Sequence, residues 1–134
     1  MSDRYDVDEV MHKLLYHFTN RDSVRRMQEP YVARFSGAKD VLDLGCGRGL
    51  FLDLLKEAGI HPVGVDGSPE VVAECIERGH EDTHVGNVLE FLEKMFAEGR
   101  QFDGIFCSHL IEHLPGRAAI QLLAHSARIL RPGG

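Results

Sequence analysis

The spacing of apolar and polar residues changes character at about residue 40. Short apolar runs of the kind that form buried strands lie at 41–44, 61–66, 83–87 and 102–108. After each run the apolar residues take helical spacing, and the first two helical stretches end at Gly59 and Gly79. Strand and helix therefore alternate four times, which is typical of an open parallel α/β sheet with helices on both faces.

The same spacing predicts helix starts and buried helix faces. Ser68, followed by Pro69, and Asn87 stand where N-caps are expected. Two helices with polar faces are expected before the sheet, over 7–18 and 21–36. The third helix after residue 40 is expected to bury Leu89, Leu92 and Phe96. The last helix is expected to present one face made of Ala119, Leu122, Leu123, Ser126, Ala127 and Leu130.

These elements divide the chain into an N-terminal helical lead-in, 1–37, and a core, 38–134. The closing segment LRPGG, 130–134, reads as the turn out of a helix after which a further strand normally follows. We therefore expect a domain truncated after its fourth strand and helix, with the C-terminal strands of the sheet missing. The fourth strand would then be an unprotected edge, which a second copy of the chain or a partner domain would cover.

Composition narrows the class of protein. The chain has 134 residues, 43% of them apolar and 27% charged, which is ordinary for one globular domain. Its net charge of −6 argues against a nucleic-acid partner. No apolar run approaches the roughly 20 residues of a membrane helix. Three separated cysteines without a C-x-x-C pair fit a reducing compartment, so we expect a cytoplasmic protein without a disulfide or zinc framework.

The stretch VLDLGCGRGL, residues 41–50, places Gly45, Gly47 and Gly49 directly after the first strand. A glycine-rich turn between a strand and its helix lets a ligand approach bare backbone N–H groups. The dinucleotide fingerprint G-x-G-x-x-G is not matched, because the third glycine comes one residue early and Leu50 occupies the last position. That spacing opposes a nicotinamide-dependent oxidoreductase.

Two aspartates accompany this turn. Asp66 ends the second strand, 21 residues after Gly45, where a carboxylate can accept both hydroxyls of a ribose. The alternative for Asp66 is a capping or turn aspartate. Asp43 lies in the first strand beside the turn and would suit the ammonium group of an amino-acid-like ligand, directly or through water. The alternative for Asp43 is that it bonds the N–H groups of the turn and only holds it.

The segments DLGCGRG, VGVDGSPEVV and LRPGG together resemble the class I S-adenosylmethionine-dependent methyltransferases, over roughly residues 38–134. The resemblance implies a Rossmann-like fold with S-adenosyl-L-methionine as cofactor. It implies that the turn wraps the methionine part, that Asp66 with Gly67 holds the ribose, and that Asn87 with Val88 borders the adenine. Asn87 would bond the adenine amino group through its carbonyl, or serve only as a helix N-cap. The cofactor-binding residues so implied are Asp43, Gly45, Cys46, Gly47, Gly49, Asp66, Gly67, Asn87, Val88 and Ser108; for Cys46 the alternative is packing beneath the turn.

The fourth strand leads into SHLIEHL, residues 108–114, at the rim where the transferable methyl group is expected. His109 and His113 are our candidate catalytic residues, as a cofactor contact or as a base that removes the acceptor's proton. Alternatively they cap and orient the following loop. H-x-x-E-H also resembles a segment of metal-dependent methyltransferases; His109, Glu112 and His113 would suit a transition metal, although our predicted site contains none. The other histidines form no constellation.

The sequence thus predicts a methyltransferase that acts on an oxygen or nitrogen atom of a small molecule or saccharide. One alternative is a catalytically inactive domain that binds S-adenosylmethionine in a regulatory role. Another is a metal-dependent enzyme similar to RNA 2′-O-methyltransferases.

Overall fold

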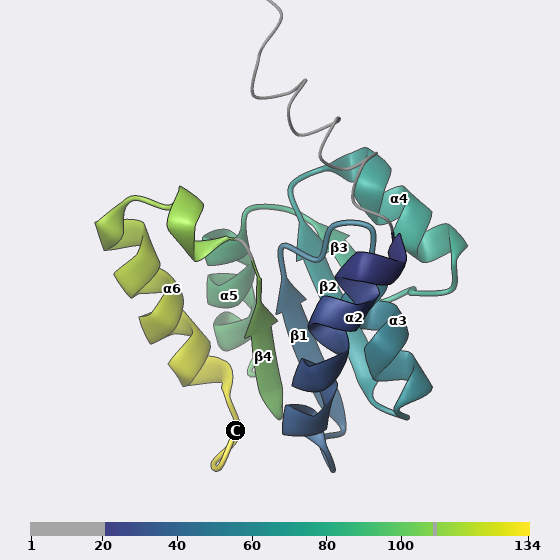
Figure 1. Ribbon diagram of the computed structural model, residues 1–134. Helices are drawn as coiled ribbons and strands as arrows, with labels where there is room; N and C mark the ends of the chain where they lie inside the picture. Colours follow the sequence, from purple (N-terminus) through teal and green to yellow (C-terminus); the bar gives the residue numbers. More distant parts are fainter. Residues whose placement is uncertain (1–20, 109) are drawn as a thin grey trace, which may run out of the picture.

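Four parallel strands form one sheet in the part of the chain that the computed structural model describes, residues 21–108 and 110–134 (Figure 1). The spatial order is β3-β2-β1-β4. The chain thus moves outward from β1 to β3 and returns to β4 on the other side of β1, which places the change of direction between β1 and β4. The predicted α/β sheet is confirmed; its strands are β1 (Asp40–Leu44), β2 (His61–Asp66), β3 (Thr83–Val85) and β4 (Gly104–Cys107).

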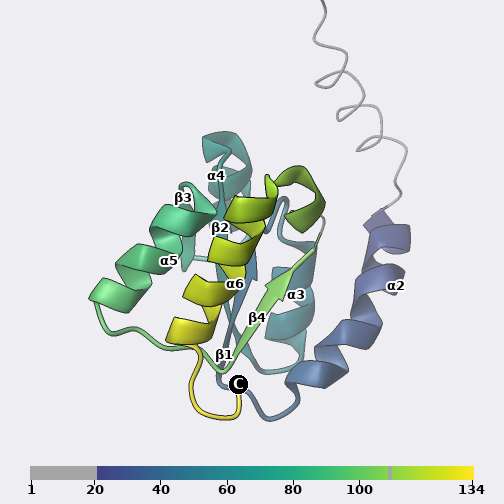
Figure 2. The same ribbon diagram turned by 90° about the vertical axis from the view of Figure 1, so that its left-hand side faces the viewer.

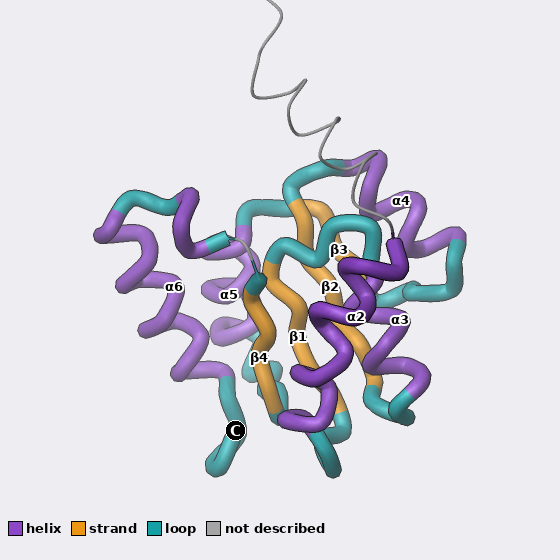
Figure 3. Tube along the Cα trace, viewed as in Figure 1, coloured by secondary structure: helices purple, strands orange, loops and turns teal. Residues whose placement is uncertain are grey.

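Helices follow the strands in alternation, as Figure 3 shows from β1 onward. The helices are α2 (Arg21–Val32), α3 (Leu50–Glu57), α4 (Pro69–Glu77), α5 (Val88–Ala97) and α6 (Gly116–Ile129), with 3-10 turns η1 (Ala33–Phe35) and η2 (Ile111–His113). In Figure 2, α5 and α6 lie on one side of the sheet and α2 and α3 on the other. The helix expected over 21–36 is α2 followed by η1, whereas the one expected over 7–18 lies outside the described residues.

Alternation of side chains along β1 divides the core between these two layers. Leu42 and Leu44 face α5 and α6, while Val41 faces α3. All three side chains are fully buried. Burial of a large apolar side chain contributes roughly 1.5–3 kcal/mol, so β1 is the strand on which both layers depend.

The predicted buried faces of the last two helices are right in part, because Leu92 of α5 and Leu122 of α6 are buried as expected whereas Phe96 and Leu123 are exposed. On α6, Leu123 is 62% exposed, and Leu122 and Ile129, seven residues apart, are the residues that enter the core. On α5, Phe96 is 48% exposed and lies beneath the guanidinium group of Arg128. The two helices pack against each other as well as on the sheet, which turns their apolar stripes away from the predicted positions. The residues that α5 buries are Val88, Phe91, Leu92 and Met95.

Aromatic side chains attach the N-terminal segment to the sheet. Phe51 of α3 stacks on Phe106 of β4 with ring centroids 3.8 Å apart, and the ring of Phe35 contacts both edge-on. A Cβ at Gly104 would lie 2.5 Å from the Phe35 ring, so only glycine permits this approach. The domain boundary at 37/38 stays a prediction.

The C-terminal segment returns beneath the amino-terminal edge of the sheet. Leu130 forms a parallel bridge with Phe102, and Arg131 pairs with Asp40 at 2.6 Å and Asp103 at 2.9 Å. No helix among the described residues has both the length and the apolar character needed to cross a membrane.

Candidate functional site

The glycine turn connects β1 to α3 at the carboxyl edge of the sheet. Gly45, Gly47 and Gly49 have φ angles of 74°, 52° and 80°, in the left-handed region that side chains rarely adopt. The N–H groups of Gly45 and Cys46 both donate to the carbonyl oxygen of Val65, at 2.8 and 3.1 Å. The turn is therefore folded over the end of β2, and its three glycines are required by backbone conformation.

Asp66 connects the turn to the next strand. Its Oδ2 accepts a hydrogen bond from the N–H of Gly47 at 3.0 Å, and its Oδ1 accepts one from the N–H of Ser68 at 3.0 Å. A carboxylate oxygen can accept two hydrogen bonds, so each still has capacity for a ligand hydroxyl. The role of turn aspartate is thus observed, and the ribose contact stays a prediction. Gly67, next to it, is exposed.

Asp43 is buried beside the turn, with 3% of its surface exposed. Its carboxyl group has no hydrogen-bond or ion-pair partner among residues 21–108 and 110–134. Burial, with smaller contributions from Asp66 and Cys75, raises the pKa of Asp43 to about 8. The alternative in which Asp43 bonds the turn is wrong, because those N–H groups donate to Val65 and Asp66. A cationic ligand group beside Asp43 would offset the free-energy cost of burying this carboxyl group without a partner.

Asn87 is the N-cap of α5. Its Oδ1 accepts hydrogen bonds from the N–H groups of Leu89 at 2.9 Å and Glu90 at 3.3 Å. The capping alternative is therefore what the structure shows, and the carbonyl oxygen is already occupied. A contact with adenine, which stays a prediction, would use the amide NH₂ of Asn87. The side chain of Val88 is packed in the core, which leaves its backbone for such a contact.

The rim after β4 includes two described residues from the prediction, Ser108 and His113. Ser108 is half-buried where β4 ends, and His113 is exposed on η2. His109 lies outside the described residues. Burial raises the pKa of the neighbouring Cys107 thiol to about 11, so it stays protonated near neutral pH and is no nucleophile. The side chain of Leu110, which we had not predicted, would lie 3.9 Å from a Cβ at Gly45 and so covers the start of the turn.

No group of three or more histidine, cysteine, aspartate or glutamate side chains within the described ranges could hold a metal ion. The metal-binding alternative built on His109, which lies outside the described residues, stays a prediction.

Two residues at the end of α4, which we had not predicted, support the turn. The thiol of Cys75 donates to the carbonyl oxygen of Gly47 at 3.3 Å, and Arg78 donates to the carbonyl oxygen of Arg48. The side chain of Cys46 is packed against Leu52 and Cys75. The packing alternative for Cys46 is thus observed, and a cofactor contact would come from its backbone. No motif indicates Arg78, since its contact spans 30 residues.

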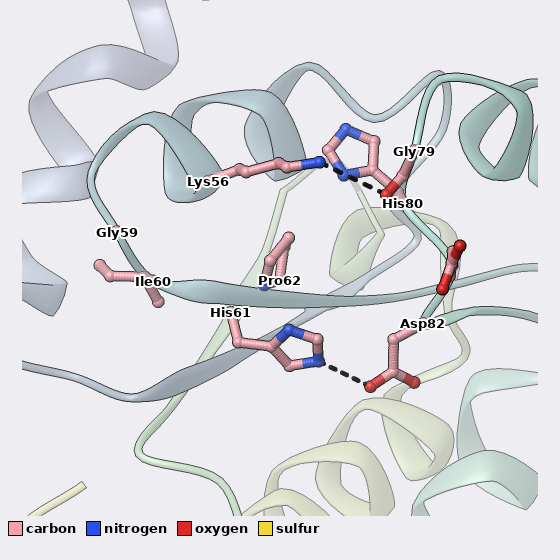
Figure 4. A pocket seen from close by; sticks show the side chains of 9 residues that line it. Lys56, Gly59, Ile60, His61, Pro62, Gly79, His80 and Asp82 are labelled. Carbon is pink, nitrogen blue, oxygen red and sulfur yellow. Dashed lines mark hydrogen bonds and ion pairs between the residues drawn. The ribbon is translucent and has the colours of Figure 1, made fainter.

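Two hollows of the surface lie away from the turn. A cavity of about 580 Å³ opens at the amino-terminal edge, where His61 bonds Asp82 at 2.9 Å and Lys56 reaches the carbonyl of Gly79 (Figure 4). A second, of about 400 Å³, runs along β3 and includes Asn87. Neither includes the glycine turn, and ligands of open α/β sheets bind at the carboxyl edge. We therefore place the candidate site at the turn.

Comparison with known proteins identifies the family of the chain. Residues 41–134 match the family described as "Methyltransferase domain". The "Ubiquinone biosynthesis O-methyltransferase" of Xylella fastidiosa is 38% identical over 101 residues, covering 74% of this chain and 40% of that protein. The enzyme of the same name from Xanthomonas oryzae pv. oryzae is 35% identical, covering 74% and 41%.

Among solved structures, a "SAM dependent methyltransferase from Archaeoglobus fulgidus" superposes with a TM-score of 0.76 at 31% identity, covering 84% of this chain and 49% of that one. The fold predicted from the sequence is confirmed. The chain spans about 40% of the length of the curated relatives named above.

Proposed function

This chain belongs to the methyltransferase-domain family, and we propose that its glycine turn and Asp66 bind S-adenosyl-L-methionine for methyl transfer to an oxygen or nitrogen acceptor. The observation that carries the proposal is the position of the Asp66 carboxylate. It bonds the N–H of Gly47 in the turn and, through its other oxygen, the N–H of Ser68. The turn and the acidic end of β2 are thereby one unit, with lone pairs left for the two hydroxyls of a ribose.

The ammonium end of the cofactor would lie toward Asp43. A buried acid with no partner among the described residues is costly, and a cation beside it removes that cost. In the resulting pair the carboxyl group is ionised, so the proton of Asp43 leaves as the ligand binds. This accounts for an acid between the fully buried Leu42 and Leu44 of β1.

The residues of the chain have a positioning task at the reactive end. When bound, S-adenosylmethionine supplies a methyl group that its positive sulfur has already activated. The protein then needs to align the acceptor and, for a hydroxyl acceptor, remove its proton. We assign the proton acceptor to the rim segment, to His113 on the exposed surface of η2 or to His109.

The acceptor we propose is a small molecule or saccharide. The relatives from Xylella and Xanthomonas are named for O-methylation in ubiquinone biosynthesis, which supports an oxygen atom of a small molecule. The net charge of −6 supports an acceptor other than nucleic acid.

Calorimetric titration with S-adenosylmethionine and S-adenosylhomocysteine tests the cofactor. Asp66→Ala is expected to weaken binding at least about ten-fold, because a hydrogen bond to a charged group is worth about 1.5–3 kcal/mol. His61→Ala changes the opposite end of the same strand and is expected to bind normally. Equal affinity of wild type and Asp66→Ala, or preferential binding of NADH, would contradict the proposal.

A further inference from the structure

We propose that Arg78 and Cys75, at the end of α4, are positioning residues that hold the glycine turn in its cofactor-binding shape. The inference rests on the proposed function and extends it to residues outside the site. Both side chains donate to carbonyl oxygens of consecutive residues in the turn, Gly47 and Arg48. They grip the turn from the side of α4, while Asp66 holds the N–H of Gly47 from β2.

Arg78 is itself held in place by a second contact. Its other guanidinium nitrogen pairs with Oδ2 of Asp53, in the first turn of α3. One planar group therefore joins the end of α4, the turn and the start of α3. Two contacts from one planar guanidinium, to two different acceptors, fix the group more closely than a single contact would.

A third residue orients the carboxylate of Asp53. The Nε2 of His80 lies 2.6 Å from Oδ1 of Asp53, and the His80 side chain is only 2% exposed. Its Nδ1 is buried without a partner among the described residues, so the hydrogen bonding of the ring is directed wholly to Asp53. His80, Asp53 and Arg78 form a chain of contacts that ends on the carbonyl oxygen of Arg48.

The packing around Gly49 shows how closely α4 approaches the turn. A Cβ at Gly49 would lie 2.9 Å from the sulfur of Cys75 and 3.7 Å from Nη1 of Arg78. The two side chains thus occupy the space that a larger residue at position 49 would need. Glycine is therefore the residue that fits where the turn meets α4.

The consequence for binding is preorganisation. Left-handed glycines are conformationally free in an unsupported loop, and a ligand that must order them loses affinity. Contacts from β2 and α4 order the turn before the ligand arrives. Loss of the Arg78 contact is therefore expected to weaken cofactor binding. Arg78 acts on binding through the turn that it supports and is not among the ligand contacts we propose.

The test compares two arginines in similar settings. Arg100 pairs with Asp82 at 2.7 Å and is 32% exposed, against 30% for Arg78, but it lies away from the turn. Arg78→Met is expected to lower the affinity for S-adenosylhomocysteine about ten-fold, which is the equivalent of one hydrogen bond to a charged group. Arg100→Met is expected to bind as wild type does, and Arg78→Lys to recover part of the affinity.

Amide hydrogen exchange supplies a readout that ordinary destabilisation would not reproduce. In Arg78→Met, exchange at Gly47 and Gly49 is expected to accelerate relative to β1, whereas Arg100→Met leaves that ratio unchanged. Wild-type affinity in Arg78→Met, or an equal loss of affinity in Arg78→Met and Arg100→Met, would overturn the positioning role of Arg78. Failure of the wild type to bind while its turn amides remain protected would instead overturn the proposed function, and with it the role assigned to Arg78.

Discussion

Two aspartates near opposite edges of one sheet have opposite electrostatic surroundings. Asp82, just before β3 at the amino-terminal edge, bonds His61, His84 and Arg100 at 2.7–2.9 Å. Partial burial alone would raise its pKa, but hydrogen bonds from these three residues outweigh it and hold the pKa well below its usual range. Asp43, in contrast, has no partner in the described chain, and burial raises its pKa to about 8.

The contrast extends to the surroundings of each residue. The amino-terminal edge carries ion pairs, such as that between Arg131 and Asp40, which join strands and loops through opposite charges. The carboxyl edge carries left-handed glycines, which lose backbone entropy on folding, and a buried acid without a partner among the described residues; both lower stability. One edge is arranged for stability and the other for a ligand, a division expected where a site sits on a rigid scaffold.

The largest expected effect comes from removing the acid at the carboxyl edge. In Asp43→Asn the free energy of unfolding should rise relative to wild type by up to about 1.4 kcal/mol per pH unit between about pH 4 and pH 8. The folded protein holds a proton on Asp43 that the unfolded chain has released in this window, so wild-type stability falls as pH rises. Urea unfolding at a series of pH values measures the slope, and parallel curves for the two proteins would refute the assignment.

A methyl group added to the turn should have the next largest effect. Gly49→Ala combines a left-handed backbone with a Cβ 2.9 Å from the sulfur of Cys75, and is expected to cost about 2–4 kcal/mol. Gly99→Ala has a similar φ, 72°, with nothing within 4 Å of its Cβ, and should cost about 1–2 kcal/mol. Thermal unfolding of both variants separates packing from backbone strain; equal losses would show that the turn is not tightly packed.

The smallest expected effect comes from the satisfied aspartate. Asp82→Asn should lose about 1–2 kcal/mol near neutral pH, because it weakens hydrogen bonds to charged partners. The folded-state pKa is lowered, so this contribution is present above about pH 4 and disappears as pH falls through the acid range. Relative to wild type, the free energy of unfolding of Asp82→Asn should therefore fall as pH rises, whereas that of Asp43→Asn should rise. Urea unfolding of both variants between pH 3 and 7 measures these slopes, and slopes of the same sign would contradict the comparison.

Local chemistry made much of the fold predictable. Ser68 and Asn87 cap α4 and α5 as their residue types suggest, and the glycines at 45–49 form the turn. The buried faces of α5 and α6 were predicted only in part: Leu92 and Leu122 are buried as expected, but the packing of the two helices on each other leaves Phe96 and Leu123 exposed. The contact of His80 with Asp53 crosses 27 residues and leaves no periodic trace, so a histidine without a motif gave no signal.

The strand β2 also constrains which substitutions the chain can accumulate. A Cβ at Gly64 would lie 2.9 Å from the sulfur of Cys46, 3.1 Å from Leu52 and 3.2 Å from Thr83. A methyl group at position 64 would therefore need room to be made at Cys46, Leu52 and Thr83 together. Because Cys46 belongs to the glycine turn, the residues that β2 can accept at position 64 depend on the packing of the turn that this strand supports.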